Sequence, residues 1–272
     1  VSAEIAKLVA VPSNPEPDGA RVGYFLTRDG VRLRYALFPR TGAEHRGTVC
    51  LVQGRAECIE KYFETVRDFQ KRGFWVATFD LRGQGGSERL IPGRTGYVEN
   101  FDDYLADLTS FHADILLPDC PPPFYLVGHS TGGLISLMAA ARDRLMFDRA
   151  FLSAPMVGLP GLPFELKWTA RLVAGLRFLG LSRLALRRKE DKPQSAERFA
   201  GNPLTSDRGR YMRAVDIYGA APELEVTIPT LAWIGSALDA MRRVNADGFP
   251  ASLKIPIFIV GAACDTVVST RS

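Results

Sequence analysis

The most informative part of the chain is Phe124-Tyr125-Leu126-Val127-Gly128-His129-Ser130-Thr131-Gly132-Gly133. It begins as an apolar, β-rich run, reaches a Gly-x-Ser-x-Gly turn, and continues into a helix-like run from Leu134 to Arg144. A strand, a sharp turn and a helix in this order form the context of a nucleophile elbow, which exposes a serine above a sheet. Side chains at positions 128 and 132 would collide with the strand and the helix, and Gly128 and Gly132 remove that collision. The stretch predicts that Ser130 is a nucleophile; the alternative is an ordinary glycine-rich turn.

Strands and helices alternate on both sides of this turn. Apolar runs predict strands at 49–53, 74–79, 150–152 and 255–260, and helical spacing predicts helices at 61–72, 101–117 and 230–244. Near the start, Asp29-Gly30 lies between two β-like runs and predicts a hairpin. The alternation favours an α/β fold with a mostly parallel central sheet and helices on both faces. Ligands of such sheets bind beyond the carboxyl ends of the strands, where Gly54, Asp80 and Ser130 are expected.

The pattern changes between Gly158 and about Thr230, where no clear strand of the main sheet is visible. Helices are expected there at 164–188 and 208–218. We therefore divide the chain into a first core part (1–157), an inserted helical cap (158–230) and a second core part (231–272).

Composition limits the classes of protein. The 272 residues, 46% hydrophobic and 24% charged, suit one globular domain with an insertion. No stretch is long and apolar enough to span a bilayer, and residues 1–17 do not have the pattern of a secretion signal. Four scattered cysteines give neither a metal spacing nor a disulfide framework, so we expect reduced thiols in a cytoplasmic protein. A net charge of +4 is too small to indicate nucleic-acid binding.

A nucleophilic serine needs oxyanion donors, a base and an acid that orients the base. The expected donors are the backbone amides of Thr131, directly after the serine, and of Arg55, in the loop after an earlier strand. The expected acid is Asp265, which follows a strand and has the order Ser then Asp; a turn-forming Asp is the alternative. Asp239 is a rival on a predicted helix, where it is expected to face solvent. Asp80 is expected to brace the glycine-rich loop that follows it.

The base is missing from this set. The chain has three histidines, His45, His112 and His129, and none has the position that the order Ser, Asp, His requires. Only residues 266–272 follow Asp265, whereas typical element lengths place the histidine about 20–35 residues further on. We therefore expect that the sequence lacks a C-terminal strand and helix with the base.

These motifs resemble the α/β-hydrolases, and most closely the monoacylglycerol lipase and lysophospholipase L2 group. The resemblance rests on Gln53-Gly54-Arg55-Ala56-Glu57 with Tyr62, on Asp80-Leu81-Arg82-Gly83-Gln84-Gly85-Gly86-Ser87, and on the elbow. Asn202 to Asp207 and Pro222-Glu223-Leu224 are similar to lysophospholipase-like members. Gln53 and Gln84 depart from the group, since many members have His at both positions. The oxyanion donors are backbone groups, so Gln53 need not impair catalysis.

The resemblance implies a serine carboxylic-ester hydrolase that acts on a single-chain lipid through an acyl-Ser130 intermediate, without a metal or organic cofactor. Between Glu165 and Arg198, nine Lys and Arg against four Asp and Glu are mixed with apolar residues. Such a pattern suits contact with an anionic membrane surface, or a cap helix with solvated charges. A short-chain carboxylesterase, a proline-type aminopeptidase and a catalytically silent binding protein remain alternatives, because fold alone does not decide function.

Overall fold

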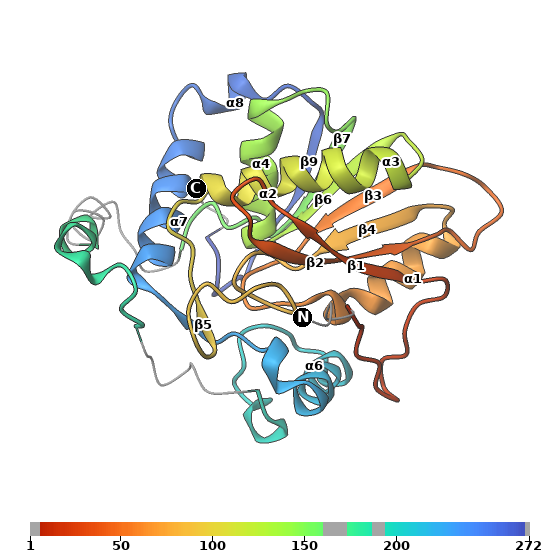
Figure 1. Ribbon diagram of the computed structural model, residues 1–272, viewed down its shortest axis with the longest axis horizontal. Helices are drawn as coiled ribbons and strands as arrows, with labels where there is room; N and C mark the ends of the chain where they lie inside the picture. Colours follow the sequence, from red (N-terminus) through yellow and green to blue (C-terminus); the bar gives the residue numbers. More distant parts are fainter. Residues whose placement is uncertain (1–5, 160–172, 187–193, 270–272) are drawn as a thin grey trace.

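In the part of the chain that the structure describes, the main sheet has seven strands in the order β1-β2-β4-β3-β6-β7-β9 (Figure 1). The computed structural model describes residues 6–159, 173–186 and 194–269. Strands β1 and β2 form the predicted hairpin, β2 pairs antiparallel with β4, and every later pair in the sheet is parallel. The strand bounds are β1 Arg21–Leu26, β2 Arg32–Phe38, β3 Thr48–Val52, β4 Trp75–Phe79, β6 Phe124–His129, β7 Arg149–Ser153 and β9 Ile257–Val260.

Helices cover both faces of the sheet, as the sequence predicts. Figure 1 shows α2, α3 and α4 on one side of the sheet and α1 on the other. The corresponding bounds are α1 Phe63–Lys71, α2 Asp102–Phe111, a π-helical turn His112–Leu116, α3 Leu117–Asp119, α4 Thr131–Arg142, α7 Leu231–Val244 and α8 Phe249–Ser252. Two apolar clusters fill the spaces between the sheet and its helices. In β3, Cys50 belongs to the cluster under α2 and α4, while Val49 and Leu51 belong to the cluster under α1. This alternation is the period of two that a strand buried on both faces requires.

The segment predicted as a cap has a different architecture. Its described part contains a π-helical turn at Arg177–Leu181, short 3-10 helices at Ala196–Arg198 and Pro222–Leu224, and helix α6 at Arg208–Ala220. The two-residue strand β8 (Ile228–Pro229) pairs with β5 (Thr95–Gly96), outside the main sheet. Much of the helix predicted at 164–188 lies outside the described residues. The domain boundaries stay a prediction.

The prediction of one helix to residue 188 is wrong at its end. Ser182 and Arg183 form a turn instead, and Leu184 to Leu186 then run along the start of α7. The Leu231 amide donates to the Leu184 carbonyl at 3.0 Å, and the Leu186 amide donates to the Pro229 carbonyl at 2.9 Å. Gly180, with φ +81°, ends the helical path because left-handed backbone cannot continue a right-handed helix.

Strand β9 is the last strand of the sheet on this side. Phe258 is 64% exposed, and it stacks on Phe151 of the neighbouring strand with ring centroids 5.8 Å apart.

No helix within residues 6–159, 173–186 and 194–269 has both the length and the apolar character needed to cross a membrane.

A buried ion network joins the loops above the carboxyl ends of the strands. Asp80, directly after β4, is fully buried and accepts hydrogen bonds from the Ile59 amide (2.9 Å), the Gly86 amide (2.7 Å) and the Arg34 Nε (2.7 Å). Arg34 also makes two 2.8 Å bonds to the Glu60 carboxylate. Burial lowers the pKa of Arg34, but Asp80 and Glu60 outweigh this effect and raise it above its ordinary value. The expected bracing role of Asp80 is confirmed, and it extends to the loop after β3.

Replacing Asp80 by Ala removes the acceptor of these groups and leaves Arg34 with only part of its compensating charge. Breaking a buried ion pair in this way costs about 3–5 kcal/mol. We therefore expect D80A to lower the free energy of unfolding by that amount in urea titrations followed by circular dichroism. The control is D239A, because Asp239 pairs with Arg242 at the surface; its expected cost is below about 1 kcal/mol. Equal losses in the two variants would contradict the bracing role.

Candidate active site

Ser130 lies in strained backbone between β6 and α4. Its φ of 50° and ψ of −114° are uncommon for a residue with a side chain, and such strain costs on the order of 1–3 kcal/mol. Three backbone hydrogen bonds hold the conformation: the Ser130 amide donates to the Ser153 carbonyl at 3.1 Å, and the Ser130 carbonyl accepts from Leu134 (3.1 Å) and Met156 (2.9 Å). The strand, strained serine and helix form the geometry predicted for a nucleophile elbow.

The glycines of the elbow are required by close backbone contacts. A Cβ at Gly132 would lie 2.1 Å from the Val52 carbonyl oxygen, and one at Gly128 would lie 2.6 Å from the Gly132 carbonyl oxygen. The predicted collisions are thus confirmed, but the collision at Gly132 would be with the end of β3 rather than with the elbow itself. Gly133 has a similar role that the pattern did not indicate, since its Cβ would lie 2.7 Å from Pro155.

The sheet gathers three predicted segments at one edge. Strands β3, β6 and β9 run parallel, so Gly54, Ser130 and Asp265 follow strand ends that lie on the same side. The Gly54 loop and Ser130 follow adjacent strands. Asp265 follows β9, which is separated from β6 by β7, and two strand spacings correspond to about 10 Å.

The loop with Arg55 is held by the carboxylate of Glu57, whose side chain is 15% exposed. Glu57 Oε2 accepts from the Gly54 amide at 2.8 Å and from the Tyr62 hydroxyl, and Oε1 accepts from Lys61 at 2.9 Å. Burial raises the pKa of Glu57, but Lys61, His129 and the Tyr62 hydroxyl together lower it to about 2. Glu57 is therefore ionised at neutral pH, and its stabilising effect is lost only as the pH falls from about 4.5 toward 2.

The Arg55 side chain leads away from the sheet toward the segment that returns from the predicted cap. Its Nη2 donates to the Thr227 carbonyl at 2.7 Å, and its guanidinium lies 5.1 Å from the centre of the Trp233 ring. The Trp233 indole in turn donates to the Tyr104 hydroxyl at 3.2 Å. Thr131, the other predicted donor, is the first residue of α4, where amides have no acceptor within the helix. The roles of the Arg55 and Thr131 amides as oxyanion donors remain predictions.

Asp265 lies in a turn after β9 and is half-buried. Its Oδ1 accepts from the amides of Val267 (2.8 Å) and Val268 (2.9 Å), which is the turn function considered as its alternative. This function and an orienting role are compatible, because a carboxylate has two oxygens. Asp239 lies on α7 with its side chain 50% exposed, as expected for a residue that faces solvent.

All three histidines lie in the described part of the chain. His45 is exposed, with Nε2 3.1 Å from the Pro122 carbonyl oxygen, and the His112 ring packs between Phe124 and Phe147. His129 has Nδ1 3.2 Å from the Ser153 carbonyl oxygen. These contacts are with carbonyl oxygens and aromatic rings rather than with Ser130, and we assign the base to none of the three histidines.

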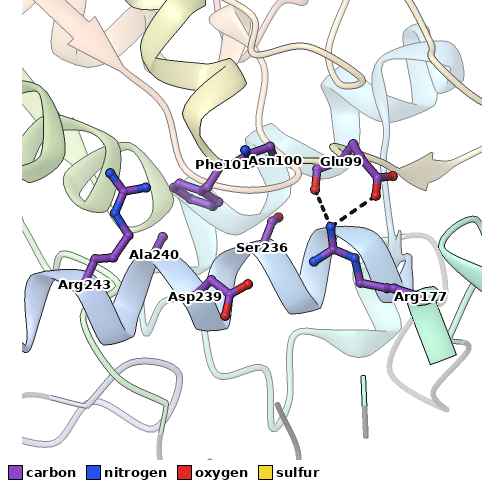
Figure 2. A pocket seen from close by; sticks show the side chains of 8 residues that line it. All are labelled: Glu99, Asn100, Phe101, Arg177, Ser236, Asp239, Ala240 and Arg243. Atoms are coloured by element: carbon purple, nitrogen blue, oxygen red, sulfur yellow. Dashed lines mark hydrogen bonds and ion pairs between the residues drawn. The ribbon is translucent and has the colours of Figure 1, made fainter. Parts of the chain in front are cut away.

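A cavity of about 210 Å³ lies between α7 and the loop before α2 (Figure 2). Arg177 points across it to Glu99, donating to the backbone carbonyl at 2.8 Å and to the carboxylate at 3.1 Å. Its charged lining residues are Glu99, Asp239, Arg177 and Arg243, two of each sign. The cavity therefore offers no net charge to a ligand, and neither Ser130 nor Asp265 lines it.

Substituting Gly132 by Ala tests the close approach of the elbow to β3. The added methyl group would meet two backbone oxygens, at 2.1 Å and 2.5 Å, which cannot move aside as a flexible side chain can. We expect G132A to lose more than about 2 kcal/mol in urea unfolding. In the control G219A, the new Cβ meets nothing within 4 Å on helix α6. That variant should gain up to about 1 kcal/mol, because Ala favours helix more than Gly does. A free energy of unfolding of G132A equal to that of wild type would mean that the elbow can relax.

Comparisons with known proteins agree with the fold described above. A family model described as "Serine aminopeptidase, S33" (Hydrolase_4) matches residues 43–272. Lysophospholipase L2 of Escherichia coli strain K12 is 33% identical over 242 residues, which cover 86% of this chain and 68% of the relative. Probable lysophospholipase L2 of Haemophilus influenzae is 27% identical over 252 residues, which cover 92% of this chain and 77% of the relative.

A solved structure of a soluble variant of monoglyceride lipase from Saccharomyces cerevisiae has a TM-score of 0.69 and 20% identity. The match covers 99% of this chain and 81% of the lipase chain. The structure of an alpha/beta hydrolase from Penicillium sp. sh18 has a TM-score of 0.57 and 18% identity. This match covers 90% of this chain and 80% of the Penicillium chain. At such identities these likenesses concern the fold, and they confirm the fold that the motifs implied. With the family match over 43–272, they show that this chain belongs to the serine aminopeptidase S33 family and has the α/β-hydrolase fold.

Proposed function

We propose that the protein hydrolyses carboxylic esters of single-chain lipids, either lysophospholipids or monoacylglycerols, through an acyl-Ser130 intermediate. The observation that carries the proposal is the strained Ser130 between β6 and α4, with φ at 50°. Backbone strain of this kind in a surface turn is maintained where it serves a function. Here it lifts the hydroxyl above the sheet edge, where an ester can reach it.

In this mechanism Ser130 Oγ attacks the ester carbonyl and gives its proton to a base. The oxyanion that forms accepts from the Arg55 and Thr131 amides, and its collapse expels the alcohol, which takes the proton. Water then attacks the acyl-Ser130 ester and releases the fatty acid. Asp265 would orient the base and stabilise its charged form, as the acid of such a triad does.

The lipid substrate is supported by the relatives rather than by a cavity. The two relatives described above are named lysophospholipase L2 and probable lysophospholipase L2, and the structure with a TM-score of 0.69 is a monoglyceride lipase. The family description names an aminopeptidase, so prolyl amides stay in the test as an alternative substrate.

An exposed apolar surface supports contact with a lipid interface. Phe178 is 92% exposed, Leu179 71% and Leu184 50%, all within the segment 177–186 of the predicted cap. Neighbouring large apolar groups in water are costly unless another surface covers them. The sequence on both sides of this segment is basic, which suits anionic headgroups. We propose that this surface, Phe178 to Leu184, docks the enzyme peripherally on its lipid substrate phase.

Substrate class is decided by parallel assays of the full-length protein with lysophosphatidylcholine, monoolein, a short acyl ester and a prolyl amide. We expect the highest kcat/KM for one of the two lipids, and labelling of the protein by a fluorophosphonate probe. S130A should abolish both, since no other group takes the acyl chain. Preference for the prolyl amide would refute the lipid substrate, and labelling that survives S130A would refute the nucleophile.

The acid is tested in the same assays with D265N and D239N. Loss of the orienting carboxylate of a triad lowers kcat by about 10⁴-fold. D265N should show a loss approaching this size, whereas D239N, on the exposed face of α7, should remain within about twofold of wild type. Equal activities of the two variants would assign Asp265 to its turn alone.

Membrane contact is tested by sedimentation with vesicles that contain phosphatidylglycerol. Withdrawing a buried Phe side chain from an apolar phase costs about 1.5–3 kcal/mol, so F178S should weaken binding by about 10- to 100-fold. The matched control is L145S: Leu145 is 82% exposed but precedes β7, at the opposite edge of the sheet from Ser130. Similar binding of both variants and wild type would remove the docking role.

A further inference from the structure

Gln84 connects the loop after β4 with the loop that contains Arg55. Its side chain is 4% exposed and makes three hydrogen bonds to one short stretch of backbone. The side-chain Nε2 donates to the Gly54 carbonyl at 2.9 Å and to the Glu57 carbonyl at 3.3 Å, and the Oε1 accepts from the Ala56 amide at 3.2 Å. The side-chain carboxamide of Gln84 therefore binds the backbone on both sides of Arg55.

One of these bonds fixes the direction of the Arg55 N–H. The Gly54 carbonyl and the Arg55 N–H belong to the same peptide unit, which is planar and trans, so the two groups point in opposite directions. Gln84 belongs to the loop after β4, and the sheet order β4-β3-β6 places that loop on the far side of β3 from Ser130. A carbonyl held toward Gln84 directs the N–H of the same unit toward the β6 side, where Ser130 lies.

The other bonds maintain a conformation that the loop would otherwise leave. Ala56 has a φ of 59°, which is unfavourable for a residue with a side chain. Its amide is held by Gln84, and its carbonyl accepts from the Tyr218 hydroxyl at 3.1 Å. Gln84 itself is fixed, because its loop is bonded to Asp80 through the Gly86 amide and the Ser87 side chain.

We propose that Gln84 is a positioning residue for ester hydrolysis: it aims the Arg55 amide at the oxyanion. This inference rests on the proposed function and deepens it. A carboxamide is suited to the task because it is neutral and offers two donor hydrogens and an acceptor from one end. A carboxylate at this position would face two carbonyl oxygens, and an aliphatic side chain of similar size would hold none of the three groups.

The test compares Q84L with Q70L. Gln70 on α1 is also buried, and its Nε2 donates to the carbonyls of Asp18 (2.9 Å) and Pro39 (2.7 Å), remote from the loop. Both variants lose buried hydrogen bonds, so a general loss of stability affects both. Losing one oxyanion donor costs 10²- to 10³-fold in kcat, and a misdirected donor should cost about 10- to 100-fold. We expect this loss in Q84L with KM within about threefold, and nearly wild-type kcat in Q70L.

Two further measurements distinguish a misdirected Arg55 amide from a general loss of stability. A trifluoromethyl ketone, which forms a tetrahedral adduct with Ser130, should lose affinity in Q84L in proportion to kcat/KM, while affinity for the fatty acid product stays constant. Q84H should recover part of the loss because an imidazole N–H can donate to a carbonyl. Equal losses of ketone and product affinity in Q84L, or kcat within threefold of wild type, would overturn the inference.

Amide hydrogen exchange gives a readout that does not need turnover. Residues 54–57 should exchange at least about tenfold faster in Q84L than in wild type, and at the wild-type rate in Q70L. Unchanged exchange in Q84L would overturn the inference even if no ester were hydrolysed. Failure of wild type to hydrolyse any ester, with faster exchange in Q84L, would instead refute the proposed function.

Discussion

Asp80 is fully buried at the end of β4, and its two carboxylate oxygens accept hydrogen bonds from separate parts of the chain. Oδ1 binds the Ile59 amide, which lies just beyond the loop of Arg55, and Oδ2 binds the Gly86 amide in the loop of Gln84. Arg34 supplies the balancing positive charge from β2. A carboxylate in the interior is stable only with such compensation. The loops after β3 and β4 therefore have one common support, and the elbow adjoins the first of them where Gly132 packs against the end of β3.

The order of strands and helices, the elbow and the bracing role of Asp80 could be predicted from the sequence, because each depends on residues close together in the chain. The hairpin at Asp29-Gly30 and the helix that begins after Thr230 are of the same kind. The contacts of Gln84 could not be predicted this way, since they require that β3 and β4 be neighbours and that one rotamer reach across. The resemblance marks Gln84 as a departure from its pattern, and this was the available signal.

Other differences have equally local causes. The turn at 182–183 and the path of 184–186 beside α7 were missed because this Leu-rich sequence suits a helix, whereas Gly180 and the carbonyl of Pro229 determine the observed path. Tyr218 and Trp233 contact the loop of Arg55 from the predicted cap and from α7, and no motif indicates contacts over such sequence separations. The pairing of Asp265 with the Val267 and Val268 amides shows that a motif position can also serve its own turn.

The loop of Arg55 is fastened to the cap segment at two points, the Tyr218 hydroxyl on α6 and the Thr227 carbonyl before β8. Lifting either α6 or β8 away from the core would break a hydrogen bond to the very loop that is expected to receive the oxyanion. These two hydrogen bonds tie this part of the predicted cap to the loop of Arg55, so we expect the two segments to move together. A variant that accepts longer or bulkier esters would have to gain space elsewhere, because separating the loop from Tyr218 or Thr227 would disturb the backbone that is expected to receive the oxyanion.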